Sequence, residues 1–203
     1  EIISPKEEAS LSSQGALTKI NFKKEYSVVV DIGGGSTEII LNKNKKFIRS
    51  ISVDVGVVTL MSKFKLTEHF TNNNLLQIQN YVIKKFSNKK IVDQICSTKF
   101  DLIMNAGTST TLAAIKQKMK IYDEKSINGY RISKQYVSTI LNKIKDIPAK
   151  KRLKIVGMEK GREKVIIYGL IILITILNIL KKRAFVVSDS GILEGLIYKI
   201  DWI

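Results

Sequence analysis

The segment 28–41, VVVDIGGGSTEIIL, restricts the fold more than any other part of the chain. A run of β-forming residues that includes Asp31 leads into three consecutive glycines, Gly33 to Gly35, and an apolar run resumes after Glu38. Each glycine costs conformational entropy on folding, so three in a row indicate that something approaches this backbone closely. We therefore predict two strands, joined by a hairpin whose turn contains the glycines.

Such a turn presents successive backbone N–H groups to one point, which suits an anion such as phosphate. A Walker loop is excluded because Gly35 is followed by Ser36 and Thr37. A dinucleotide fingerprint is excluded because a strand, and not a helix, follows the glycines. Asp31 adds a hard oxygen ligand suited to Mg²⁺, and strand alternation places Glu38 to face the same pocket. The alternative is a plain glycine hairpin with two solvated carboxylates.

A second segment, NAGTSTTLAAI at 105–115, supports an anion site. Gly107 closes a buried strand there, and Thr108 begins a run of four hydroxyl residues that opens a helix. The free N–H groups and the dipole of a helix N-terminus favour an anion, although ordinary capping accounts for one or two of these hydroxyls. The similar pattern SDSGILEG at 188–195 is interpreted as a capped core helix.

Apolar periodicity predicts a mixed α/β sheet. Five strands are expected, at 26–31, 37–41, 47–53, 102–107 and 184–190, and the polar stretch 120–164 is interpreted as a helical insertion or subdomain. The apolar run 165–180 is shorter than the roughly 20 residues of a membrane span and contains polar residues, so we predict a buried core helix and expect no membrane association.

The amino-acid composition limits the kinds of catalytic, metal-binding and nucleic-acid-binding sites that the chain can form. Cys96 is the only cysteine and His69 the only histidine, which excludes zinc clusters and most Cys/His or Ser/His nucleophiles. The formal net charge of +16 indicates attraction to polyanions, although a lysine-rich composition bias explains it equally well. No basic stretch is interleaved with aromatic residues, so we expect no specific nucleic-acid partner.

These motifs together resemble the exopolyphosphatase/guanosine pentaphosphate phosphatase (Ppx/GppA) family, within the superfamily of actin, sugar kinases and heat-shock ATPases. The similar segments cover nearly the whole chain and follow the order EIISPKEEASL, VVVDIGGGSTEIIL, SISVDVGVVTLMSKF, NAGTSTTLAAI, GMEKGREKVIIYGLIIL and VVSDSGILEGLIY. The resemblance implies a ribonuclease H-like, actin-like α/β fold with a mixed five-stranded sheet flanked by helices. It also implies Mg²⁺-dependent hydrolysis of the terminal phosphoanhydride of inorganic polyphosphate or pppGpp.

The resemblance further assigns roles to residues. Glu8 corresponds to the catalytic base, and Asp31 and Glu38 to the carboxylates that organise metal and water. The resemblance assigns phosphate binding to Gly33, Gly34, Gly35, Ser36, Thr37, Gly107 and Thr108. It places Arg162 near the substrate. Without the resemblance, Glu7 and Glu8 read as acids at a helix N-terminus.

The chain departs from the family pattern at Pro5, Ser10 and Asn128, where the family has Gly, Arg and His. The family's first phosphate loop has no counterpart, so residues 1–203 are interpreted as the second domain of a two-domain, cytoplasmic enzyme that shows little turnover alone. A homodimer is compatible with the cleft arrangement. Two alternatives stay open: the ATP-binding half of an actin-like kinase or ATPase, and a non-catalytic domain that senses polyphosphate or nucleotide.

Overall fold

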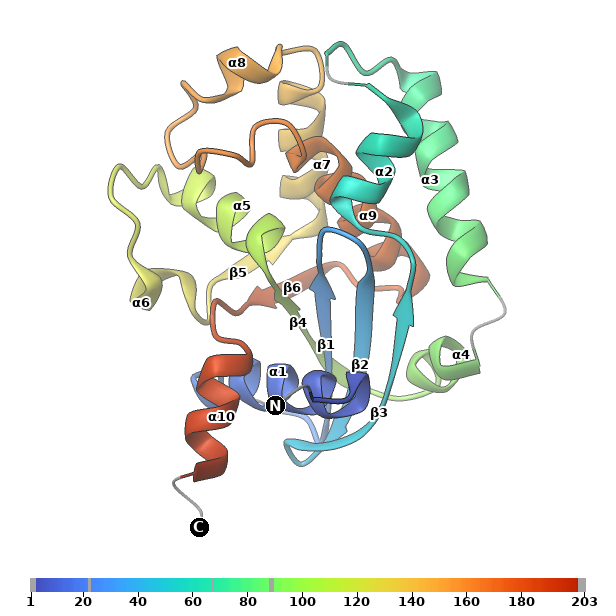
Figure 1. Cartoon of the computed structure of the whole chain (residues 1–203), viewed down its shortest axis with the longest axis vertical. Helices are drawn as coiled ribbons and strands as arrows, with labels where there is room; N and C mark the ends of the chain where they lie inside the picture. The colour runs from blue at the N-terminus through green and yellow to red at the C-terminus, as the bar shows by residue number, and fades with distance from the viewer. Residues whose placement is uncertain (1–2, 22, 67, 88–89, 201–203) are drawn as a thin grey trace.

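The structure, a computed structural model, describes residues 3–21, 23–66, 68–87 and 90–200 (Figure 1). The strands are β1 (Tyr26–Ile32), β2 (Thr37–Lys43), β3 (Lys46–Val53), β4 (Phe100–Asn105), β5 (Arg131–Ser133) and β6 (Ala184–Val187). The helices are α1 (Pro5–Thr18), α2 (Val57–Phe64), α3 (Asn72–Phe86), α4 (Lys90–Cys96), α5 (Gly107–Gln117), α6 (Glu124–Ile127), α7 (Lys134–Ile144), α8 (Ala149–Arg152), α9 (Ile166–Ile179) and α10 (Ile192–Ile200).

The strands form one mixed sheet in the order β3-β2-β1-β4-β6-β5. Strands β1, β4 and β6 run parallel, whereas β2 and β3 form an antiparallel meander at one edge and β5 is antiparallel to β6. The mixed α/β sheet is confirmed, but the expected number of five strands is wrong, because the described residues form a sheet of six. The additional strand, β5, lies within 120–164. At three residues it is too short to show strand alternation, and only its pairing with β6 defines it.

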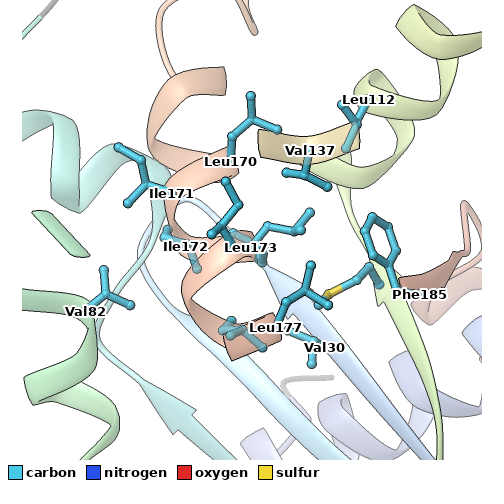
Figure 2. Packing of buried hydrophobic residues seen from close by; sticks show 14 of the residues in the cluster. Val30, Val82, Leu112, Val137, Leu170, Ile171, Ile172, Leu173, Leu177 and Phe185 are labelled. Carbon is cyan, nitrogen blue, oxygen red and sulfur yellow. The ribbon is translucent and has the colours of Figure 1, made fainter. Parts of the chain in front are cut away.

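Helix α9 forms the centre of the larger core. Every residue from Ile166 to Leu177 is buried, and Figure 2 shows Leu170, Leu173 and Leu177 among side chains of the sheet and the neighbouring helices. Fully burying one such aliphatic side chain contributes about 1.5–3 kcal/mol, so this helix is a principal source of stability. The prediction of a buried core helix is confirmed. In the described part of the chain, no helix has the length and apolar composition that a membrane crossing requires.

The opposite face of the sheet carries α1 and α10, which lie side by side (Figure 1). Strand alternation separates the two faces: Val28 and Val30 belong to the core around α9, whereas Val29 packs with the apolar residues of α1. The two helices approach closely at glycines. A Cβ atom on Gly15 would lie 1.7 Å from the carbonyl oxygen of Gly191, and one on Gly195 would lie 2.0 Å from that of Leu11.

Because β1, β4 and β6 are parallel, their carboxyl ends meet at one edge of the sheet, which is where ligands bind in open α/β sheets. Asp31 lies near the end of β1, and Asn105 pairs with it at the end of β4. The segment after β6 reaches the same edge and begins α10. The fold thus gathers three loops and the start of α10 around one region.

Candidate functional site

Three carboxylates that are separated in the sequence line one cavity of about 860 Å³. Asp31 and Glu38 face each other across the β1–β2 pair, where they are direct register partners. Glu8 reaches the same cavity from the first turn of α1, and Gly33 and Ser36 contribute from the hairpin. The structure therefore brings together the carboxylates that the sequence singled out, through a helix and a hairpin that lie on the same side of the sheet edge.

Each of the paired carboxylates is held by side-chain donors. Asp31 Oδ2 accepts hydrogen bonds from Ser12 Oγ at 3.3 Å and from Asn105 Nδ2 at 3.2 Å. Glu38 Oε1 accepts from Ser36 Oγ at 2.6 Å and from Ser52 Oγ at 2.7 Å. Burial and the nearby charge of Glu38 raise the pKa of Asp31 from 3.8 to about 6.

The pair fits a divalent cation of the Mg²⁺ type. Among the described residues, no Lys or Arg forms an ion pair with Asp31 or Glu38, so no positive side chain pairs with either carboxylate. The described residues also contain no cluster of three or more His, Cys, Asp and Glu side chains placed to hold a metal. Mg²⁺ commonly takes only one or two carboxylates and completes its shell with water and phosphate oxygens, so two carboxylates beside an open cavity match its requirements.

The titration of Asp31 predicts how metal-free stability depends on pH. Because its folded pKa of about 6 exceeds the unfolded value of 3.8, the folded state binds more protons in this interval, and stability falls as pH rises from 3.8 to about 6. Asp31→Asn removes the penalty, so we expect the variant to be more stable than the parent at pH 7 by up to about 3 kcal/mol and equally stable below pH 4. Urea unfolding without metal at several pH values measures this. Equal stability at pH 7 would contradict the buried, repelled carboxylate.

The glycine turn offers free backbone donors. The N–H of Gly33 donates to the carbonyl of Ser36 at 2.9 Å and closes the turn, whereas those of Gly34, Gly35 and Ser36 have no protein acceptor within the described ranges. The turn is anchored from behind, because the carbonyls of Gly33 and Gly34 accept from the first N–H groups of α2. Gly56 permits this contact, since a Cβ there would lie 2.3 Å from the Gly34 oxygen.

A substitution at Gly35 can test anion binding without destabilising the fold. A Cβ on Gly35 would meet no atom within 4 Å, and its φ lies outside the left-handed region. Gly35→Ala should therefore leave stability unchanged or raise it by up to about 1 kcal/mol, but we expect at least about tenfold weaker binding of tripolyphosphate, because the methyl group occupies space beside the free amides. Thermal unfolding with and without tripolyphosphate tests both parts. Unchanged affinity would remove this amide from the anion site.

Thr37 contributes differently from the glycines. Its Oγ1 is buried and donates to the Val55 carbonyl at 2.5 Å, which ties the start of β2 to the loop before α2. Ser36 likewise uses its hydroxyl on Glu38, so in these two residues the hydroxyls organise the hairpin. The backbone N–H of Ser36 has no acceptor among the described residues, whereas Thr37 belongs to the sheet, where it pairs with Ile32 and Val53.

A second cavity, of about 720 Å³, contains Gly107 and Arg162. The guanidinium of Arg162 lies directly over Gly107, where a Cβ would come within 2.2 Å of it, so only glycine leaves room for this approach. Ala106, the N-cap of α5, has φ 69° and ψ 172°, a backbone region that strongly favours glycine. Thr108 does not line this cavity, because its side chain packs against Gly169 of α9.

Asn105 connects the two cavities. It is 6% exposed, donates to Asp31 and lines the cavity of Gly107 and Arg162. Sequence reasoning missed Asn105 as a site residue, and likewise Ser12 and Ser52. Asn105 carried a signal, because it directly precedes the strand-ending Ala-Gly of the second motif. The two serines carried none, because only the packing of α1 and β3 brings them to the carboxylates.

The departures from the family pattern lie at the periphery. Helix α1 begins at Pro5, a residue suited to the first helical turn, and Ser10 lies half-buried within the same helix. The Oδ1 of Asn128 accepts from the Asp189 N–H at 2.9 Å, and its Nδ2 donates to Glu124 Oε1 at 3.2 Å. Asn128 thus holds together segments beside the second cavity without lining it.

Comparisons with known proteins identify the family of this chain. The model of the Ppx/GppA phosphatase family matches residues 1–201. The bifunctional 3-dehydroquinate synthase/phosphatase of Fusobacterium nucleatum is 31% identical over 200 residues, which cover 96% of this chain and 29% of that protein. Exopolyphosphatase 2 of Mycobacterium tuberculosis is 30% identical over 205 residues, which cover 97% of this chain and 62% of that protein.

The fold comparison gives the same result. The solved structure of the Aquifex aeolicus PPX-GPPA enzyme matches with a TM-score of 0.86 and 28% identity, over 98% of this chain and 64% of that one. The chain thus spans less than two thirds of the length of these relatives. The likeness confirms the actin-like α/β fold that the sequence motifs implied. With the family model matched almost from end to end, the chain belongs to the Ppx/GppA phosphatase family.

Proposed function

We propose that the protein carrying this chain hydrolyses the terminal phosphoanhydride bond of inorganic polyphosphate or pppGpp. The observation that carries this proposal is the convergence of Glu8, Asp31 and Glu38 with the glycine hairpin on a single cavity. Phosphoryl transfer requires mainly positioning and electrostatic stabilisation of charge on the phosphoryl oxygens. The cavity has a separate carboxylate, Glu8, and a pair of carboxylates, Asp31 and Glu38, beside the backbone amides of the hairpin. These are the groups that phosphoryl transfer to water requires.

In this proposal Glu8 is the general base. Its neighbour Glu7 forms an ion pair with Lys199 of α10 at 3.3 Å, whereas Glu8 lines the cavity. Of the two adjacent acids, Glu7 therefore contributes to the contact of α1 with α10, and Glu8 is left to face solvent in the site. A water molecule placed in line with the terminal phosphorus would transfer its proton to Glu8 as it attacks.

The remaining groups act on the charge of the substrate. We assign the N–H groups of Gly34, Gly35 and Ser36, which have no acceptor among the described residues, to the terminal phosphoryl oxygens, where fixed donors are most effective. Asp31 and Glu38 would hold Mg²⁺. The chemistry that Mg²⁺ supplies when bound is neutralisation of the charge that develops on the phosphoryl oxygens and the leaving group.

The second cavity extends the proposed substrate site. Among the described residues the N–H groups of Gly107 and Thr108 have no backbone acceptor, and the Arg162 guanidinium lies beside Gly107. This combination of a helix N-terminus and a cation suits the phosphates that follow the terminal one. Asn105 lines the second cavity and donates a hydrogen bond to Asp31 of the first, which supports one continuous polyanion path.

We further propose that residues 1–203 form the second domain of a two-domain enzyme, with 120–164 as its helical insertion. The relatives' greater length supports this, since this chain spans 62% of the mycobacterial exopolyphosphatase. Both cavities are open on this domain. A facing domain would complete the cleft and exclude bulk water from the reaction.

The test is phosphate release by the full protein that carries this chain, with Mg²⁺ present. Long-chain polyphosphate, pppGpp and ATP are compared as substrates, and EDTA serves as the metal-free control. Metal-dependent release from polyphosphate or pppGpp is expected. Consumption of ATP alone would favour an actin-like kinase or ATPase, and tight binding without release would favour a sensing domain.

A further inference from the structure

Asp31 and Glu38 are held by the protein in the same way. Each gives only one oxygen to the protein: Oδ2 of Asp31 to Ser12 and Asn105, and Oε1 of Glu38 to Ser36 and Ser52. An ionised carboxylate only accepts hydrogen bonds, so the three hydroxyls and the amide all act as donors. The second oxygens, Asp31 Oδ1 and Glu38 Oε2, have no hydrogen-bond partner among the described residues.

The donors come from separate parts of the fold. Ser12 belongs to α1, Asn105 ends β4 and Ser52 lies on β3. Two donors on one oxygen fix both the rotamer and the rotation of a carboxylate. Each carboxylate is thereby oriented from two sides, and its other oxygen is left for a ligand.

We infer that Ser52 and Asn105 are positioning residues, which hold Glu38 and Asp31 so that one oxygen of each is free to coordinate a divalent cation. This inference rests on the proposed function, because that function assigns the cation to these carboxylates. Mg²⁺ demands near-ideal octahedral geometry, so a ligand that rotates freely binds it poorly. Partners that orient the ligands of a metal typically change affinity by about 10–100-fold.

Ser52 allows the sharpest test. It is exposed on the edge strand β3, and its hydroxyl bonds only to Glu38 among the described side chains. Its removal should therefore leave folding unchanged. Asn105, in contrast, is buried and borders the second cavity, so its replacement would disturb packing as well as orientation.

The experiment measures Mn²⁺ binding by electron paramagnetic resonance in the full protein without substrate. Ser52→Ala should bind Mn²⁺ about tenfold or more weakly at unchanged melting temperature, and Ser52→Thr, which keeps the hydroxyl, should restore affinity. Ser50→Ala is the matched control, because Ser50 lies two residues earlier on the same face of β3 and has no side-chain hydrogen bond in the described structure. In turnover, Ser52→Ala should raise the Mg²⁺ concentration for half-maximal rate, and saturating Mg²⁺ should restore kcat.

The outcomes separate this inference from the proposed function. If Glu38→Gln weakens Mn²⁺ binding but Ser52→Ala does not, the positioning role is wrong and the metal site stands. If Ser52→Ala weakens binding but Ser52→Thr does not restore it, the hydroxyl is not the operative group and the inference also fails. If neither Glu38→Gln nor Asp31→Asn changes Mn²⁺ affinity, the metal site itself is wrong, and the positioning role falls with it.

Discussion

Replacing Glu8 by glutamine is expected to lower kcat for phosphate release by about 10²–10⁴-fold, the usual contribution of a positioned general base. Glutamine keeps the size of the side chain and its place in the first turn of α1 but cannot accept the proton of the attacking water. Because Glu8 is exposed in the cavity, the melting temperature should change little. Substrate binding, measured without turnover, should be retained.

Glu7→Gln is the matched control for this experiment. It removes the neighbouring charge from the same helical turn and breaks the surface ion pair with Lys199, a pair worth about 0–1 kcal/mol. Its kcat should equal that of the parent. Full activity in Glu8→Gln, or equal losses in both variants, would show that Glu8 only stabilises the helix N-terminus.

Replacing Gly15 by alanine should have a large effect that begins at the contact between α1 and α10. Glycine to alanine inside a helix normally stabilises by roughly 1 kcal/mol. Here the new Cβ would lie 1.7 Å from the Gly191 oxygen and 2.9 Å from the Gly195 nitrogen, which are backbone atoms of the loop and helix α10 and cannot rotate away. Helices α1 and α10 must separate, and we expect a loss of about 1–3 kcal/mol in the free energy of unfolding.

The same displacement should lower activity. Helix α1 carries Glu8 and Ser12, so its movement shifts both the base and one donor to Asp31. A misplacement of about 1 Å can cost about 10²-fold in rate. Urea unfolding measures the stability, and kcat is measured well below the melting temperature. Gly35→Ala, with open space around its Cβ, is the stability control; equal stability of the two variants would contradict the close contact of α1 with α10.

The strands and the central helix could be predicted from the sequence because their signals are local. The run of β-forming residues at Val28 to Val30 and the glycine turn give β1 and β2, and the long apolar run gives α9. Strand β5 could not be found, because three residues carry no periodicity and Ile132 becomes part of a strand only by pairing with Phe185. The core helix was predicted at 165–180, and α9 spans Ile166–Ile179, a difference of one residue at each end.

Some residues of the candidate site could likewise be predicted from the sequence, and others could not. Asp31 and Glu38 were predictable as partners because a hairpin fixes their register, and Gly107 because it ends a strand before a helix. The prediction of Glu8 as a site residue depended on the family resemblance. Glu7 and Glu8 are adjacent glutamates, and no local pattern in the sequence distinguishes them. Only the packing of α1 against α10 and the sheet assigns Glu7 to Lys199 and leaves Glu8 in the cavity.

The sequence alone determined the chemical inventory of this protein: carboxylates, glycine amides and hydroxyls, with a single cysteine and a single histidine. It also determined the hairpin, which depends on residues close together in the chain, and the family, which depends on the order of short motifs along it. Tertiary structure decided which donors orient the carboxylates and that the site residues divide between two cavities joined by Asn105. The reason is physical: hydrogen bonds between Ser12, Ser52, Asn105 and their carboxylates join elements whose relative positions are fixed by core packing and sheet order, which no local pattern records.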